Sequence, residues 1–160
     1  MDDLHQLYQD ILKHLISLCQ TAMSPKELDQ CIHTLPPAYS ICHFKNGLSA
    51  LSQISGNERK NMAKILLGCL IGAIPKQGLL AVKSILEFVY LDQYSMHDSD
   101  TLQYIEDTLI TWEENCPLFL KTGICNDFNI PKFHSLLHYT DSIHLFGATD
   151  NYNKCLRGYI

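Results

Sequence analysis

Two histidines in the second half of the chain have a spacing that could bring them together on one helical face. His134 and His138 are four residues apart, and Asp141 extends the same face by a further turn. Histidine nitrogen and carboxylate oxygen are both ligands that Zn²⁺ accepts in proteins. Position 135 is a serine, however, so the His-Glu-x-x-His pattern of zinc proteases, with its general base, is absent. We therefore interpret the pair as boundary histidines that hydrogen-bond to neighbouring helices. A metal-dependent hydrolase that uses His134 and His138 is kept as an alternative.

Acidic residues are grouped in the middle of the chain, where paired carboxylates could serve acid–base chemistry. Asp98 and Asp100 stand directly before a helical pattern, a place where aspartate is preferred as an N-cap. Two adjacent acidic pairs follow at positions 106–107 and 113–114. Neighbouring residues of a helix point apart, so neither pair can share a proton or a metal ion. We therefore predict that Asp98 or Asp100 caps the helix and that the two acidic pairs lie on a solvated face.

Two further motifs are weak candidates for chemistry. Cys42 is followed by His43, but adjacent side chains rarely reach the geometry of a nucleophile and its base. Gly68 and Gly72 lack the preceding strand and the following Lys-Ser/Thr of a phosphate-binding loop, so close helix packing is the better explanation. The spacing of residues therefore predicts no catalytic residue, no metal site and no cofactor.

The composition fits a single domain with its own core. The chain has 160 residues, of which 46% are hydrophobic and 18% charged, and its net charge is −5. Between Asp92 and Glu114 there are seven acidic residues and no Lys or Arg. Nucleic-acid-binding domains usually carry a clustered basic face, so we expect no unaided binding to nucleic acid.

Cysteine usage and hydropathy indicate an intracellular protein that does not enter a membrane. Seven cysteines, an odd number without a Cys-x-x-Cys motif, are typical of free thiols that pack as small hydrophobic residues. The most apolar stretch, Ile65 to Ile74, is ten residues long. A membrane-spanning helix needs about 20, so we predict a buried core helix here.

The spacing of apolar residues predicts helices along most of the chain. From Leu4 to Ala22, apolar side chains recur at the i, i+3, i+4 and i+7 positions of one helical stripe. Ser24 and Ser55 are each followed three residues later by Glu, which predicts two N-caps with capping boxes. A further helix is expected over roughly 76–95, with Leu79, Val82, Leu86, Val89 and Tyr90 directed inward.

Two more helices complete this prediction. One begins after Asp98 or Asp100, and the other runs from Pro131 through Ile143 and ends at Gly147. No convincing alternating strand pattern occurs. We therefore predict an all-α fold, a single domain of about five to seven packed helices.

Several strings, taken in order, resemble one family. The strings are His43-Phe44-Lys45-Asn46-Gly47, Ile54-Ser55-Gly56-Asn57-Glu58-Arg59-Lys60, Pro131-Lys132-Phe133-His134 with Leu137-His138-Tyr139, and Phe146-Gly147 with Thr149-Asp150-Asn151-Tyr152-Asn153. Together they resemble the C-terminal helical region of Plavaka-type transposases, fungal relatives of the CACTA and Kyakuja-Dileera-Zisupton DNA transposons. The resemblance spans roughly residues 30–153.

The resemblance implies a parent enzyme whose chemistry this chain does not keep. Such transposases are similar to ribonuclease-H-fold enzymes, in which three carboxylates hold two metal ions for strand cleavage and transfer. The first two carboxylates would lie upstream, and the family's Thr-Glu run after Asn-Tyr-Asn is replaced here by residues 154–160. We expect a truncated transposase-like helical domain over 1–153, a divergent tail over 154–160 and no enzymatic activity. His134, His138, Asp150 and Asn151 are retained as family-motif positions, with a bracing role for the histidines.

Three functions remain open from the sequence. The first is a truncated, transposon-derived domain that contacts another protein, such as an intact transposase, in the nucleus that the resemblance implies. The second is a freestanding helical protein-interaction module. The third is the hydrolase described above. DNA that flanks the gene distinguishes the first two functions, because an upstream ribonuclease-H-like stretch is expected only for the remnant of a transposase.

Overall fold

The computed structural model describes residues 3–36, 44, 47, 56–92, 94, 96–127, 133, 136 and 138–146. All regular elements in this part of the chain are helices, and they pack as a single domain, as the periodicity predicts. The helices are α1 (Asp3–Ala22), α2 (Pro25–Thr34), α3 (Gly56–Leu70), α4 (Lys76–Leu91), α5 (Ser99–Asn115), α6 (Pro117–Lys121) and α8 (Tyr139–Phe146).

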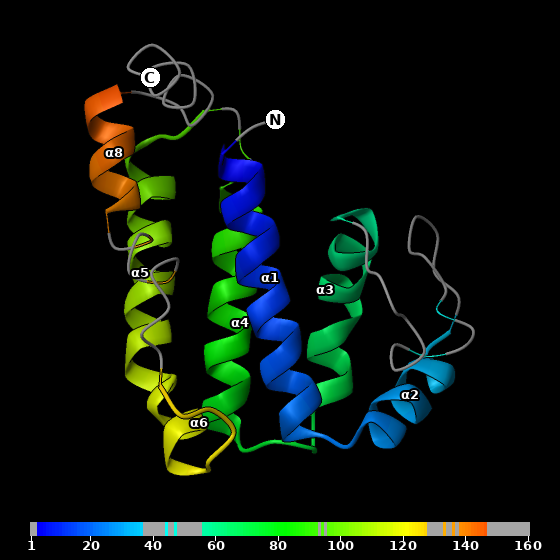
Figure 1. The fold of residues 1–160 in the computed structure, drawn as a ribbon. Coiled ribbons are helices and arrows are strands. Elements are labelled where there is room, and N and C mark those ends of the chain that lie inside the picture. The colour runs from blue at the N-terminus through cyan, green and yellow to red at the C-terminus, as the bar shows by residue number, and fades with distance from the viewer. Residues whose placement is uncertain are drawn as a thin grey trace.

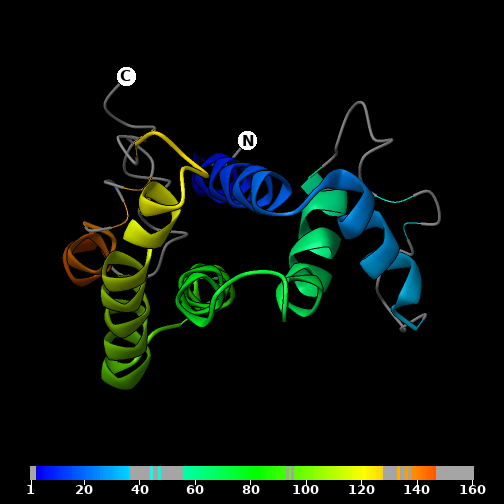
Figure 2. The ribbon, with the colours of Figure 1, turned by 90° about the horizontal axis from the view of Figure 1, so that it is seen from below.

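Helix α4 lies at the centre of the arrangement. It forms an antiparallel pair with α5, which is the most extensive helix pair of the described residues (Figure 1). Helix α1 crosses in front of α4 and also packs against α3, while α8 lies beside α5 (Figures 1 and 2). Helix α2 continues from α1 at the far side of α3 (Figure 2). The α4–α5 pair is therefore covered on one side by α1 and flanked by α8.

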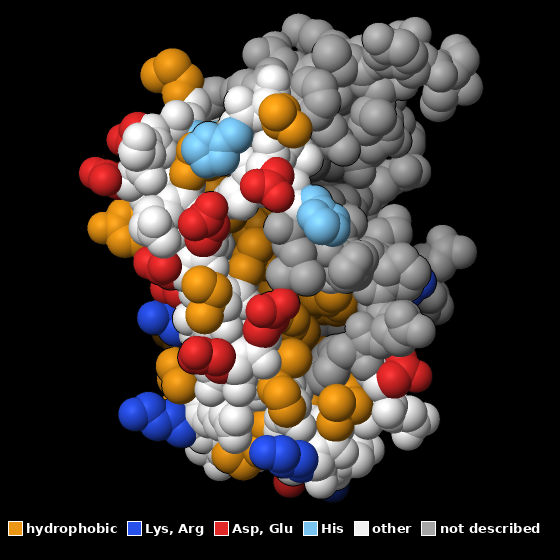
Figure 3. Space-filling model, turned by 90° about the vertical axis from the view of Figure 1, so that its left-hand side faces the viewer, with side chains coloured by type: hydrophobic (Ala, Val, Ile, Leu, Met, Phe, Trp, Pro, Cys, Tyr) orange, Lys and Arg blue, Asp and Glu red, His pale blue; other side chains and the backbone are white. Residues whose placement is uncertain are grey.

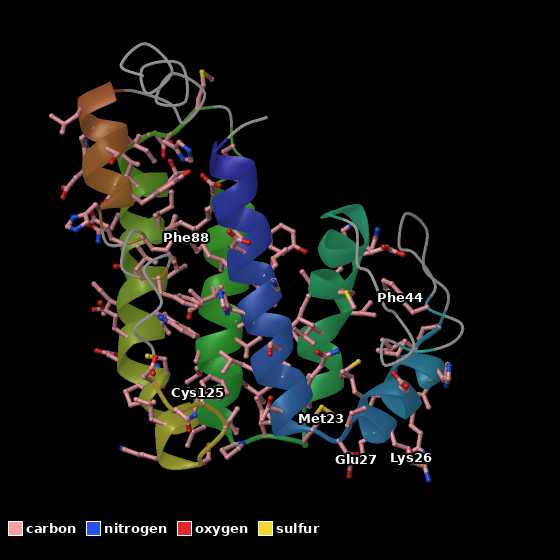
Figure 4. All side chains as sticks on the ribbon, in the orientation of Figure 1. Met23, Lys26, Glu27, Phe44, Phe88 and Cys125 are labelled. Atoms are coloured by element: carbon pink, nitrogen blue, oxygen red, sulfur yellow. The ribbon has the colours of Figure 1, made fainter. Side chains whose placement is uncertain are left out.

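Local hydrogen bonds explain where two of the helices begin. The hydroxyl of Ser24 accepts the backbone N–H of Glu27, and Glu27 Oε2 accepts the N–H of Ser24 at 3.0 Å, which confirms the predicted capping box of α2. Glu27 lies at the start of α2, remote from α4 and α5 (Figure 4). At α5, Asp98 is the N-cap, and its Oδ1 accepts the N–H of Thr101 at 2.8 Å. The predicted cap at Ser55 lies outside the described residues.

The core stripe of α4 differs from the prediction at one residue. Val82, Leu86 and Val89 are buried, but Tyr90 is 44% exposed. Tyr90 is rotated by about 100° from Val89, and this rotation carries it off the buried stripe. The helix also ends at Leu91 instead of position 95, with Asp92 as its C-cap. The inward orientation predicted for Tyr90 is wrong.

The prediction of close helix packing at Gly68 and Gly72 is also wrong. Gly68 is exposed in α3, and a Cβ added to it would meet no atom within 4 Å. Gly72 lies in the turn after α3 with a φ of +84°. Glycine is favoured there because a Cβ is strained in this backbone conformation. The two glycines therefore share no common function.

The cysteines that the structure describes are free, and two of them belong to the core. Cys19 and Cys69 are both buried in the hydrophobic cluster. Burial raises the pKa of the Cys19 thiol to about 12 and that of Cys69 to about 11. Both therefore act as small hydrophobic residues, as the sequence predicts. Among the described helices, none has the length and apolar character that a membrane span requires.

Candidate functional site

The predicted histidine pair is only partly visible in the structure. His134 lies outside the described residues, as do Asp150 and Asn151. His138 is exposed and occupies a turn directly before α8. Its carbonyl oxygen accepts the N–H of Ser142 at 3.1 Å and the hydroxyl of Ser142 at 2.7 Å. The prediction placed His138 inside one helix running from Pro131 through Ile143, whereas the structure has it in the turn before α8, which begins at Tyr139.

Of the other candidates of the sequence, the structure places Asp141 and leaves Cys42 and His43 undescribed. Asp141 is exposed in the first turn of α8, where the helix dipole stabilises a negative charge. Cys42 and His43 are outside the described residues. Within the described part of the chain, no group of three or more His, Cys, Asp or Glu side chains is placed to hold a metal ion.

The acidic pairs of α5 form a solvated face. Asp107, Glu113 and Glu114 are exposed, and Glu106 is half-buried, which agrees with the prediction. Seen from the side of α5 and α8, acidic side chains alternate with hydrophobic ones, and Lys and Arg side chains are visible near the bottom and at the edges of this face (Figure 3). This surface is both acidic and partly apolar.

A shallow groove lies between α4 and α5. Its volume is about 410 Å³, within the range of ligand-binding pockets. Side chains from both helices line it: Glu87, Tyr90, Leu91, Tyr104, Asp107, Thr108 and Thr111. We refer to these seven residues as the α4–α5 groove.

Two tyrosines give the groove its aromatic character. Tyr90 on α4 is 44% exposed and Tyr104 on α5 is 60% exposed. Partial burial raises the pKa of the Tyr90 phenol above its ordinary value of 10.0. Tyrosines that combine a large apolar ring with a polar end are enriched at protein interfaces. Both rings therefore offer surface to a partner.

The threonines of the groove differ in what they present to another molecule. Thr108 donates its hydroxyl hydrogen to the carbonyl of Ile105 at 2.6 Å, and Thr111 donates to the carbonyl of Asp107 at 2.8 Å. A hydroxyl has a single hydrogen to donate. That hydrogen is already engaged within α5, so only lone pairs remain. Thr108 is buried, whereas the hydroxyl of Thr111 is exposed and can accept a hydrogen bond from another molecule.

The carboxylates of the groove are held by weak local contacts. Asp107 Oδ1 accepts the amide of Gln103 at 3.1 Å. Glu87 Oε1 is 3.2 Å from Lys83 Nζ, and both of these side chains are about half exposed. Exposed ion pairs contribute little, about 0–1 kcal/mol, so a partner can displace this one. Glu87 and Asp107 are the charged residues among the described lining residues, and no Lys or Arg is among them, so the lining of the groove is acidic.

A second feature is the burial of polar atoms on Asp92, His97 and Tyr139. Among the described residues, Asp92 Oδ1, both ring nitrogens of His97 and the Tyr139 hydroxyl are buried without a hydrogen-bond partner. Tyr139 packs edge-on against Phe88, which lies between α4 and α5, with ring centroids 5.2 Å apart (Figure 4). Burial raises the pKa of Asp92 to about 7 and lowers that of His97, although the charge of Asp98 opposes the shift of His97.

The sequence patterns did not identify the groove. Tyr90 was predicted to face the core, and Tyr104 was not singled out. The available signal was the occurrence of tyrosines in an acidic stretch without Lys or Arg. The hollow itself depends on how α4 and α5 pack, which a one-dimensional pattern does not contain.

Comparisons with family models, with curated proteins and with solved structures find no match to this chain.

Proposed function

We propose that this chain is a helical protein-interaction domain, without catalysis of its own, that descends from a cut-and-paste DNA transposase. The interaction function is carried by one observation, the acidic α4–α5 groove with its two half-exposed tyrosines. Exposed aromatic side chains around a concave surface are typical of sites that bind other molecules. In this proposal, the helices hold the groove and a partner protein fills it.

The descent from a transposase has separate support. It rests on the ordered strings between His43 and Asn153 that resemble Plavaka-type transposases. The test is to sequence the DNA upstream of the gene. A stretch that encodes a ribonuclease-H-like, Asp-bearing segment in any frame would support the descent. Flanking DNA without such a stretch would favour the freestanding interaction module.

The interaction function is tested with the full chain and two matched variants. Tyr104→Ser changes the groove, and Ile110→Ser changes an exposed apolar residue of α5 that does not line it. Each protein is used to isolate partners from the source cells, and the partner is then purified and its affinity measured by calorimetry. We expect the wild type and Ile110→Ser to bind it equally and Tyr104→Ser to bind more weakly. Equal affinity of all three proteins would refute a binding role for the groove.

A further inference from the structure

We propose that the α4–α5 groove binds an arginine side chain from a basic segment of the partner protein. The guanidinium group would lie against Tyr90 and Tyr104 and pair with the carboxylates of Glu87 and Asp107. This inference rests on the proposed interaction function and specifies the chemistry of the partner.

The aromatic rings favour a planar cation. Tyr90 and Tyr104 belong to different helices and line the same hollow. Arginine stacks on aromatic faces, where the ring quadrupole attracts its charge. Its guanidinium is also more weakly hydrated than an ammonium group, so it loses less on entering a partly apolar site. An aliphatic side chain would pack against the tyrosine rings but would not pair with the carboxylates.

The polar groups of the groove call for hydrogen-bond donors. Thr111 uses its hydroxyl hydrogen within α5 and presents the lone pairs of an exposed oxygen. Asp107 and Glu87 add carboxylate oxygens, one on each helix. Arginine has five N–H donors and no acceptor, so its side chain can donate hydrogen bonds to these acceptor oxygens. A carboxylate or phosphate ligand would place its own acceptor oxygens against the acceptor oxygens of the groove.

The surrounding charge selects the same class of partner. The α5 wall belongs to a stretch with seven acidic residues and no Lys or Arg between Asp92 and Glu114, and the whole chain has a net charge of −5. On the α4 wall, Lys83 forms an exposed ion pair with Glu87, which an incoming guanidinium would replace. Complementary charge speeds association and rejects partners of like charge. A second copy of this acidic chain, or an acidic peptide, would be repelled. A basic segment is the occupant that charge and hydrogen bonding both favour.

The test measures peptide binding to the full-length protein. Fluorescein-labelled hexa-arginine is titrated with the protein, and anisotropy is recorded at low ionic strength. Hexa-lysine tests whether the planar guanidinium matters, and hexa-citrulline is the uncharged counterpart of nearly the same shape. We expect hexa-arginine to bind more tightly than hexa-lysine, and hexa-citrulline to bind far more weakly than both. Equal affinity for arginine and citrulline peptides would overturn the proposal, and equal affinity for arginine and lysine would overturn its guanidinium part.

Matched variants separate the groove from general electrostatic attraction. Asp107→Asn removes a groove carboxylate, and Glu113→Gln removes an exposed one of α5 that does not line the groove. Tyr104→Ala removes a ring, whereas Tyr104→Phe keeps it. We expect Asp107→Asn and Tyr104→Ala each to weaken hexa-arginine binding about two- to five-fold. Glu113→Gln and Tyr104→Phe are expected to change it by less than that. Far-ultraviolet circular dichroism verifies that each variant is folded.

Four further outcomes would contradict the proposal. Equal weakening by Glu113→Gln and Asp107→Asn would show that the peptide binds to the diffuse acidic surface. Amide chemical-shift changes confined to residues outside the groove would place the peptide elsewhere. Self-association lost in Tyr104→Ala would make a second copy the occupant. If the partner isolated from cells requires Tyr104 but binds normally after its arginines are replaced by glutamine, the interaction function stands and the arginine site fails.

Discussion

Asp92 makes the stability of the domain depend on pH in a direction opposite to that of most carboxylates. It is the C-cap of α4, and burial raises its pKa from 3.8 to about 7. The negative end of the helix dipole lies at the same position and also disfavours a charge there. Between these two pH values the folded state binds more protons than the unfolded chain. The contribution of Asp92 is therefore fully present below pH 3.8 and is lost as the pH rises through about 7.

The magnitude follows from the size of the shift. The pKa of Asp92 rises from 3.8 to about 7, a shift of roughly 3 units. At about 1.4 kcal/mol per unit, this shift corresponds to at most about 4 kcal/mol in the free energy of unfolding. Asp92 keeps part of its contact with solvent, so we take about half of that limit, ~2 kcal/mol. The substitution Asp92→Asn keeps the shape and removes the ionisation. We expect the variant to be about 2 kcal/mol more stable than the wild type at pH 8 and nearly equal to it at pH 4.

Urea unfolding of the full chain, followed by circular dichroism from pH 4 to pH 8 at constant ionic strength, measures this difference. The matched control is Asp107→Asn, the same chemical change at an exposed position of α5. The control should follow the wild type across the whole range. If the gain from Asp92→Asn is the same at pH 4 as at pH 8, burial of the charge is not its cause and the reasoning is refuted.

Further predictions concern helix geometry, caps and thiols. Alanine at Gly68 should raise the free energy of unfolding by about 0.5–1 kcal/mol, because the site is open and helical, whereas Gly72→Ala should lower it by about 1 kcal/mol, because φ is +84° there. Thermal unfolding of the two variants tests these opposite signs, and a change of the same sign in both would contradict them. Ser24→Ala and Asp98→Ala should each lower the free energy of unfolding by about 1 kcal/mol, because each removes an N-cap. Urea unfolding measures this loss, and losses below about 0.2 kcal/mol would show that the caps are dispensable. Cys19 should react with a thiol reagent only after unfolding, because its thiol is buried and its pKa is about 12. Mass spectrometry that finds Cys19 modified before unfolding would contradict its position in the core.

The features that were predictable from the sequence depend on neighbours in the chain. The capping box at Ser24 and the cap at Asp98 involve residues three positions apart, and a local pattern contains all that is needed. The burial of Val82 and Val89 follows from helical periodicity in the same way. The all-α fold class follows from many such local signals in agreement.

The errors concern properties that local patterns do not determine. Tyr90 is apolar enough to suit either side of α4, and the packing of neighbouring helices decides that it is exposed. Gly72 has the spacing of a packing motif, but its positive φ places it in a turn. His138 lies within the helical pattern of its sequence region, yet it occupies a turn and α8 begins at the next residue. The α4–α5 groove combines the surfaces of two helices, so periodicity within either helix cannot reveal it.

The two walls of the groove are formed by consecutive helices, and this proximity in sequence has a consequence for how the site persists. All seven lining residues fall between positions 87 and 111, and α4 and α5 are joined directly. Local, antiparallel helix pairs form quickly and tend to open as one cooperative unit. Amide hydrogens of both walls should then exchange together, and fraying of α8 should leave the groove intact. The α4–α5 groove is therefore expected to fold and unfold as one continuous stretch of the chain.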